Sequence, residues 1–451
     1  MEKVKSGVYR RTATFREAFS SKEAFIKLIE TQESATGRLE HRNHWKNEDL
    51  DISPPSHWTW AWYDYAAFWW SYGFSPGVWS LGSSLSRIPW GLRAAYFPVL
   101  IRVVTCTIWV GVSLIQGGYF VAVCLRCIFG HNFTDIPNHI PASAGINIQQ
   151  MIGLIVIWFG TLPLLSVPIP RIRVIFSVKS FVLPPITIGL FIYCMLQGKG
   201  MGTEFKSTVP MKGSTLAWAM LSGINSVMGK TSTLVVNQPD IARYARTRNT
   251  PIFATAAIKN AWGTALWNPW DLCGEILDRS WTPGTRTWVF IVNAGFVLSQ
   301  VAGNLGANVI PWGADSMTFC PRFLNIKRGM YLSYLLGVII CPWKILKSAS
   351  SFLAFLGGYS IFLGPFLGIF ITDYFVIRKG NIFVEDLYTE NGRYWYYHGA
   401  SWRAVVAYLV AVAWTLPSFA AIFGEEVESA GPRRGSEVEV EVVGVSAQKK
   451  V

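Results

Sequence analysis

Residues 97–124 read FPVLIRVVTCTIWVGVSLIQGGYFVAVC, an apolar stretch with almost no charge. A helix of about 20 residues crosses the roughly 30 Å hydrocarbon core of a bilayer, so this stretch is long enough to span a membrane. Similar apolar runs recur along the chain at 60–85, 149–168, 175–197, 214–236, 286–311, 330–346, 350–377 and 402–423. The pattern predicts an all-α integral membrane protein with about nine visible spans.

The composition favours the same class of protein. Hydrophobic residues make up 51% of the 451 positions, charged residues 15%, and there are 21 tryptophans. The net charge of +13 sits between the apolar runs, as the positive-inside rule predicts, and this favours a membrane protein over one that binds nucleic acid. The seven cysteines have no regular spacing, so we expect no disulfide framework, no metal site and no cofactor.

Three segments are expected. Residues 1–57 are polar and rich in Lys and Arg, without a cleavable signal peptide, and are predicted to be a cytosolic N-terminal segment. Residues 58–423 are predicted to form the transmembrane transporter domain. Residues 424–451 end in a Glu-Val alternation and are predicted to be a disordered tail of cytosolic type.

The clusters of basic residues between the apolar runs predict further spans that do not stand out as apolar runs in the sequence. If all the clusters are cytoplasmic, an even number of spans must separate any two of them. One visible span separates Arg248 from Arg322, and three separate the N-terminus from Arg171. The charge pattern is therefore typical of a chain with two more spans, near 86–96 and 251–270.

No arrangement of side chains predicts an enzyme. Gly229-Lys230-Thr231 ends like a phosphate loop, but Ile224 stands where that motif needs its first glycine. Cys124 and Cys127 have the spacing of zinc ligands, and no second pair follows them. No histidine pairs with a serine or cysteine nucleophile on the same element, so a membrane-embedded enzyme is disfavoured.

Two predicted spans contain helix breakers. Ser75-Pro76-Gly77 interrupts the first run, and Ser222-Gly223 with Gly229 loosens the fifth. Backbone groups freed at such a break must bond to protein, water or ligand, so a broken span usually lines a cavity. Two breaks in comparable positions favour the binding site of an inverted-repeat transporter over kinks that serve packing alone.

Polar side chains in two other spans add to this prediction. Trp109 and Ser113 lie one helical turn apart, where an indole face and a hydroxyl can meet one planar ring. Asn304 and Asn308 repeat at the same spacing, and amides in a membrane helix need partners or a cavity. The alternatives are a tryptophan that only packs against its neighbours and amides that only bond neighbouring helices.

Seven short motifs share one family pattern: Asn47-Glu-Asp-Leu50, Trp58-Thr-Trp60, Trp109-Val-Gly111, Asn237-Gln-Pro-Asp-Ile-Ala-Arg-Tyr244, Asn304-Leu-Gly-Ala-Asn308, Cys341-Pro-Trp343 and Thr372-Asp-Tyr374. Together they resemble the nucleobase–cation symporter-1 family, and most closely its fungal uracil, uridine and allantoin permease branch. The resemblance runs from about residue 45 to residue 423. It implies a LeuT-like core of five plus five helices in inverted repeats, followed by two more, with spans one and six broken around the substrate.

The resemblance also implies roles for particular residues. Trp109 would be the stacking aromatic of span three, and Asn308 the amide of span eight that binds the heterocycle. Ser75 would add a substrate contact at the break of span one. Lys230 lies at the break of span six, where we expect it to take part in ion coupling; an anchoring lysine that reaches the cytoplasmic interface is the alternative.

The chain departs from the family pattern in ways that bear on its function. Ser113 stands where family members often carry glutamine. Ala302 and Gly303 replace two hydroxyl residues of sodium-coupled relatives, so a proton is the expected co-substrate. Spans two, seven and twelve are not visible.

These features predict proton-coupled uptake of a nucleobase-like heterocycle, such as uracil, uridine or allantoin, at the plasma membrane. The expected partners are that substrate, a proton and the lipid bilayer, and no nucleic acid. A truncated member of the family that is transport-inactive or regulatory is the alternative.

Overall fold

The computed structural model describes residues 87–197, 268–346, 349–379 and 392–414, with the single positions 381, 383, 386 and 416. The predicted N-terminal segment, the runs at 60–85 and 214–236, and the tail lie outside these residues, and so do Ser75 and Lys230. In the described ranges the regular elements are helices, beside one isolated bridge between Tyr397 and Ala400. The prediction of an all-α protein is confirmed for this part of the chain.

The elements follow one another in this order: α5 (Arg87–Trp90), α6 (Tyr96–Phe129), α7 (His131–Thr134), η4 (Ala142–Ala144), α8 (Ile148–Thr161), η5 (Leu162–Ser166), α9 (Ile169–Gln197), α12 (Pro269–Arg279), α13 (Pro283–Asn304), η8 (Leu305–Val309), α14 (Ile310–Met317), α15 (Ile326–Ile339), η9 (Pro342–Lys344), α16 (Ala349–Ile371) and η10 (Thr372–Ile377). A last helix covers Trp402–Trp414.

Four of the described helices are long and apolar enough to cross a membrane: Tyr96–Phe129, Ile148–Ser166, Val174–Gln197 and Pro283–Met317. They lie over four of the apolar runs in the sequence. Their burial differs. In the most apolar part of Tyr96–Phe129, 61% of the residues are buried, whereas in that of Val174–Gln197 only 17% are buried. The first is therefore an interior helix, whereas the outward side chains of α9 form an apolar surface suited to lipid.

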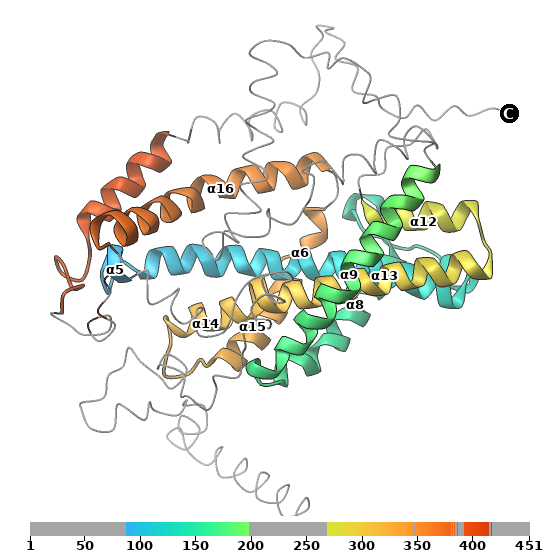
Figure 1. Ribbon diagram of the computed structural model, residues 1–451, viewed down its shortest axis with the longest axis horizontal. Helices are drawn as coiled ribbons and strands as arrows, with labels where there is room; N and C mark the ends of the chain where they lie inside the picture. Colours follow the sequence, from blue (N-terminus) through green and yellow to red (C-terminus); the bar gives the residue numbers. More distant parts are fainter. Residues whose placement is uncertain are drawn as a thin grey trace, which may run out of the picture.

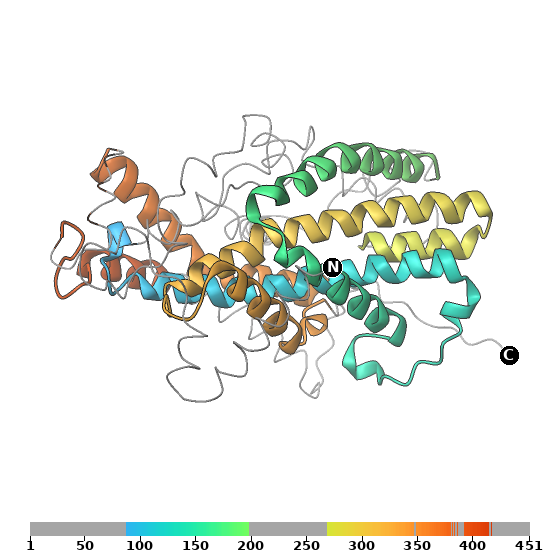
Figure 2. The ribbon, with the colours of Figure 1, turned by 90° about the horizontal axis from the view of Figure 1, so that it is seen from below.

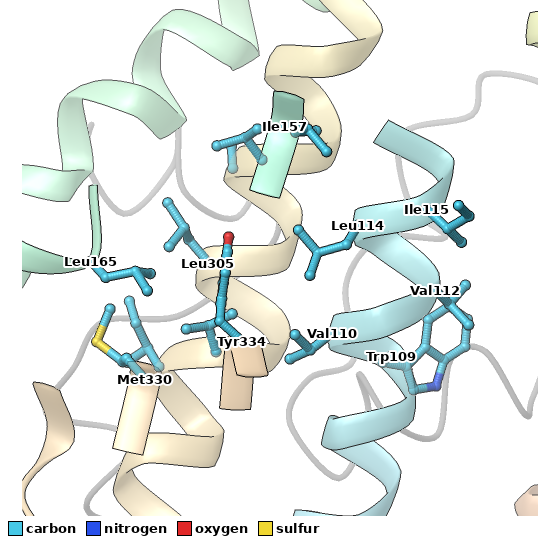
Figure 3. Packing of buried hydrophobic residues seen from close by; sticks show 14 of the residues in the cluster. Trp109, Val110, Val112, Leu114, Ile115, Ile157, Leu165, Leu305, Met330 and Tyr334 are labelled. Atoms are coloured by element: carbon cyan, nitrogen blue, oxygen red, sulfur yellow. The ribbon is translucent and has the colours of Figure 1, made fainter. Parts of the chain in front are cut away.

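Helix α6 is the axis around which the described helices pack. It runs along most of the length of the molecule and contacts α8, α13, α14 and α15 (Figure 1). Seen from below, α9 lies beside α13, on the side away from α15 (Figure 2). The largest cluster of buried apolar side chains joins α6 to these neighbours; Figure 3 shows Val110 and Leu114 directed at Leu305 and Tyr334.

Glycines on α6 allow this close packing. A Cβ added to Gly118 would lie 2.8 Å from the Cα of Leu154 on α8, and one added to Gly153 would collide with the carbonyl oxygen of Gly118. On another side of α6, a Cβ at Gly111 would collide with the carbonyl oxygen of Gly337 on α15. Small residues at helix crossings are typical of membrane proteins, where backbone contact and dispersion hold helices together.

Both ends of α6 are tied to other segments. At its C-terminal end, Arg286 of α13 donates to the carbonyl oxygen of Cys127 at 2.7 Å, so an otherwise unpaired helix-end carbonyl is satisfied. At the other end, the ring of Phe97 packs against Phe366 and Tyr408, with ring centroids 5.9 and 5.3 Å away. These contacts fix the axial position of α6 relative to the rest of the described bundle.

A buried ion pair joins α6 to α14. The Nη2 of Arg102 lies 3.2 Å from the Oδ2 of Asp315, and the carboxylate side chain is fully buried. One turn away, Trp312 donates its indole N–H to Thr107 at 2.8 Å. Two charges in a dry interior are costly unless they stay together, so this pair constrains the crossing of the two helices strongly.

The glycine contact between α6 and α8 generates a stability prediction. Gly153→Ala should lower the free energy of unfolding by about 1–3 kcal/mol, because the added methyl forces two backbones apart. Gly160→Ala is the matched control on the same helix, since a Cβ there meets no atom within 4 Å. Thermal unfolding of the purified chain in detergent measures both changes. Equal melting temperatures for the two variants would contradict the packing described for Gly153.

The ion pair between α6 and α14 generates a second prediction. Arg102→Met should destabilise the protein by about 3–5 kcal/mol, because it leaves the buried carboxylate of Asp315 without its cation. Combining Arg102→Met with Asp315→Leu should restore most of the lost stability, since no charge then remains buried. A double variant as unstable as the single one, measured by the same melting assay, would show that the pair is not the source of the effect.

Candidate functional site

Three of the predicted site residues lie together at the crossing of α6 with η8. Trp109 and Ser113 occupy successive turns of α6, and Asn308 lies in η8, the single π-helical turn between α13 and α14. All three side chains are nearly buried, with 8% exposed surface each. A π turn widens a helix locally and is often found at functional sites, and here it carries the predicted amide.

The amide nitrogen of Asn308 is the centre of the hydrogen bonds at this crossing. It donates to the Oδ1 of Asn304 at 2.9 Å, and it lies 3.4 Å from the hydroxyl of Ser113 and 3.5 Å from the carbonyl oxygen of Trp109. Asn304 in turn donates to the carbonyl oxygen of Val110 at 3.3 Å. The two asparagines therefore bond both to each other and to the neighbouring helix, as the helix–helix alternative predicts.

The indole of Trp109 packs against an aromatic side chain of another helix. Figure 3 shows it on the side of α6 opposite to Val110 and Leu114. Tyr359 of α16 packs against it in a T-shaped arrangement, with ring centroids 6.4 Å apart and planes at 87°. The two rings are thus nearly perpendicular, and the tyrosine is not stacked in parallel on the tryptophan.

The wall behind the two asparagines is apolar. Leu305 is fully buried, and Tyr334 of α15 is almost fully buried beside it. Trp158 of α8 donates its indole N–H to the carbonyl oxygen of Tyr334 at 3.2 Å, which ties this wall together. Hydrogen bonds shielded from water by such a wall are stronger than exposed ones, so these bonds help to hold η8 against α6.

The two positions directly before Asn304 offer no side-chain oxygen. Ala302 and Gly303 are both buried in α13, as their apolar character favours. Sodium binds best to several oxygen ligands, and these two positions contribute none.

The structure leaves some predicted features apart from this site. Ser75 and Lys230 are outside the described residues, so their placement at the site stays a prediction. Within the described ranges no group of three or more His, Cys, Asp or Glu is arranged to hold a metal ion, and Cys124 and Cys127 are both buried as free thiols. A cavity of about 350 Å³ beside Arg286 lies at the other end of α6 and contains none of the predicted residues.

Sequence reasoning missed three residues at or near the crossing: Tyr359, Tyr334 and Asp315. Each lies in an apolar or mixed run with no local motif of its own. Their importance comes from contacts with residues more than 170 positions away, which spacing within one helix does not reveal. Arg102 carried a signal that was available, because a lone arginine within a membrane helix calls for a partner.

Comparison with known proteins places these features in a family. A family model described as a permease for cytosine/purines, uracil, thiamine and allantoin matches residues 81–253 and 248–431. An uncharacterized permease of Schizosaccharomyces pombe is 34% identical over 77% of this chain and 62% of its own length. The uracil permease of Saccharomyces cerevisiae is 28% identical over 84% of this chain and 70% of its own length. The allantoin permease of the same yeast is 31% identical over 74% of this chain and 56% of its own length.

Among solved structures, the chain is similar to Mhp1, a nucleobase-cation-symport-1 family transporter in a closed conformation with bromovinylhydantoin bound. The match covers 82% of this chain and 80% of the Mhp1 chain. Its sequence identity is 22%, and the TM-score is 0.49. The chain spans about 62% of the length of the S. pombe permease and 56% of that of the allantoin permease. Since the family model matches most of the chain, the resemblance seen in the motifs is confirmed, and the protein belongs to the nucleobase–cation symporter-1 family of permeases.

Proposed function

We propose that this protein is a secondary transporter that carries a nucleobase-like heterocycle across the plasma membrane, with a proton as co-substrate. The observation that carries the proposal is that the Asn308 amide lies within hydrogen-bonding distance of the Ser113 hydroxyl and of the backbone carbonyl of Trp109, inside two membrane-length helices. Relatives named for uracil, uridine, allantoin and thiamine support a small heterocyclic substrate.

The chemistry of these side chains suits a flat polar ring. An indole offers a stacking face, and a hydroxyl with an amide offers a donor and an acceptor for the ring edge. The site lies in a buried part of the bundle, where each such bond counts for more than in water. Ser75 is the further substrate contact that we propose from the family pattern.

Proton coupling is the finer part of the proposal. Ala302 and Gly303 bring no oxygen to the position where sodium-coupled relatives carry two hydroxyls. Lys230, in the predicted break of span six, is the group that we propose stands in for the cation or exchanges a proton. A desolvated lysine loses its proton more readily than one in water, which suits a role in coupling.

A transport-inactive or regulatory member of the family is the second candidate. The odd numbers of visible spans between neighbouring basic clusters favour it, because the charge pattern predicts two further spans near 86–96 and 251–270. Residues 87–95 form the short α5 and a turn before α6 begins, so no membrane-length helix lies there. Parallel uptake assays of this chain and of a version with both spans restored separate the two candidates.

Substitution of the stacking residue tests the substrate site. Trp109→Ala should weaken binding about tenfold or more, since stacking on an aromatic side chain contributes roughly 1–3 kcal/mol per base. Trp109→Phe keeps an aromatic face and should retain most of the uptake. Uracil, uridine, allantoin and thiamine uptake is measured in a yeast strain without its own permeases, with surface expression as the control. Unchanged uptake in Trp109→Ala would show that the site is placed wrongly.

Ion replacement tests the coupling. Uptake should rise as the external pH falls, and it should be indifferent to exchange of sodium for potassium, because the protonated carrier is the form that turns over. Lys230→Met should flatten this pH dependence while the protein still reaches the cell surface. Sodium-dependent uptake, or a pH profile that Lys230→Met leaves intact, would refute the proposed coupling.

A further inference from the structure

A cavity lies where the C-terminal end of α6 meets the N-terminal end of α13 (Figure 2). Its volume is about 350 Å³, which is within the range of small-molecule pockets. Six residues line it: Cys127, Ile128, Pro283, Arg286, Thr287 and Phe290. Arg286 is the one charged side chain among these six, and none of them is acidic. The cavity therefore has a positive wall in otherwise apolar or uncharged surroundings.

The guanidinium of Arg286 has donor capacity left over. Its Nε and Nη2 atoms donate to the backbone carbonyl oxygens of Cys127 and Ile128, at distances between 2.7 and 3.2 Å. In the described part of the chain its Nη1 atom bonds to no acceptor, and no carboxylate pairs with this side chain. The ring centroid of Trp281 lies 5.0 Å from its Cζ atom and helps to fix the guanidinium in place. An anion with more than one oxygen is the group that such a donor binds best.

The lengths of the helices put the cavity at the level of the lipid headgroups. A hydrocarbon core of roughly 30 Å takes up about 20 helical residues. The spans Tyr96–Phe129 and Pro283–Met317 have 34 and 35 residues, so about seven residues extend beyond the core at each end of a centred helix. Arg286 is the fourth residue of its span, and Ile128 is the last but one of the other. Both lie in the headgroup layer, where a tryptophan such as Trp281 is also typical.

An apolar surface continues from the cavity toward the hydrocarbon core. Phe290, one helical turn beyond Arg286 on α13, lines the cavity and is 36% exposed, and its neighbour Ile291 is 52% exposed. On the facing end of α6, Ile128 and Phe129 are 54% and 58% exposed. The cationic side chain and the apolar surface thus follow one another in the same order as the phosphodiester and the acyl chain of a phospholipid.

We propose that this cavity binds one membrane phospholipid, with its phosphodiester on Arg286 and an acyl chain along Phe290 and Ile291. The guanidinium can donate to two oxygens of the phosphodiester, which is its preferred geometry with phosphate. The apolar surface favours a lipid over a free phosphate ion, because an ion has no hydrocarbon to place there. The bound lipid connects the ends of α6 and α13, at a site separate from the one proposed for the heterocycle.

Lipids that differ only in the headgroup test this site. The purified full-length chain in a phosphate-free maltoside detergent is titrated with the dioleoyl forms of phosphatidylcholine, phosphatidylglycerol and digalactosyldiacylglycerol, and the rise in melting temperature reports binding. Both phospholipids should half-saturate the protein at a concentration about tenfold lower than the galactolipid, because hydrogen bonds to charged groups are the stronger ones. Equal half-saturation by all three lipids, or a response to phosphatidylcholine alone, refutes recognition of the phosphodiester.

Two arginine variants separate the cavity from general charge. Arg286→Gln should remove most of the preference for phospholipid, because the phosphodiester loses its cationic partner. Arg279→Gln is the matched control at the same end of the bundle: it removes the same charge from an arginine that pairs with Glu275 at 2.9 Å and does not line the cavity. This control should keep the preference. An equal loss in both variants would show that only the net charge of the protein matters.

A second pair of variants keeps the bonds from Arg286 to α6, so it also serves if Arg286→Gln does not fold. Thr287→Asp places a carboxylate in the cavity, whereas Thr287→Asn places an uncharged side chain of the same shape there. The preference for phospholipid should disappear in Thr287→Asp and persist in Thr287→Asn. A preference that survives in Thr287→Asp contradicts the site.

Compounds without acyl chains test whether the occupant is a lipid. Inorganic phosphate and glycerophosphocholine, each added at the half-saturating concentration of phosphatidylcholine, should leave the melting temperature unchanged. Stabilisation by either compound to the same extent as by the lipid overturns the proposal of a lipid as occupant. All of these measurements are made without uptake, so their failure leaves the proposed transport function standing.

Discussion

The structure depends on how closely α6 approaches the helices around it. At Gly118 and Gly111 the backbone of α6 lies against α8 and α15 with no space for a side chain. In a bilayer the apolar side chains gain little by leaving lipid for protein, so close contact between backbones is a main source of helix association. This contact brings α6 within hydrogen-bonding reach of the polar side chains on η8 and α14.

The same approach makes two polar interactions possible in an apolar interior. Asn304 and Asn308 bond to the backbone and side chains of α6, and Arg102 pairs with Asp315 about two turns away along the same helix. Each arrangement satisfies groups that would be costly to bury alone. They differ in what they join, because the ion pair joins two charged side chains while the amides also bond to the backbone of α6.

Much of the candidate site could be predicted from the sequence, because it follows local spacing. Trp109 and Ser113 are one helical turn apart, and the motif around Asn308 is a short continuous stretch that matches the family. The contact of Tyr359 with Trp109 and that of Asp315 with Arg102 could not be predicted, since each pairs residues from distant spans. The π turn at Leu305–Val309 was not predicted either, although the sequence holds Gly306 within it and Pro311 in the first turn of α14 that follows.

The serine at position 113 makes the orientation of one amide decisive. A glutamine there, as in many family members, would carry a donor and an acceptor of its own to the ring edge. Serine ends at a single oxygen close to its own helix, and that oxygen already faces the nitrogen of Asn308. In the proposed site, the amide of Asn308 is therefore the larger polar group beside that hydroxyl. The hydrogen bond that Asn308 donates to Asn304 holds this amide at the crossing with α6.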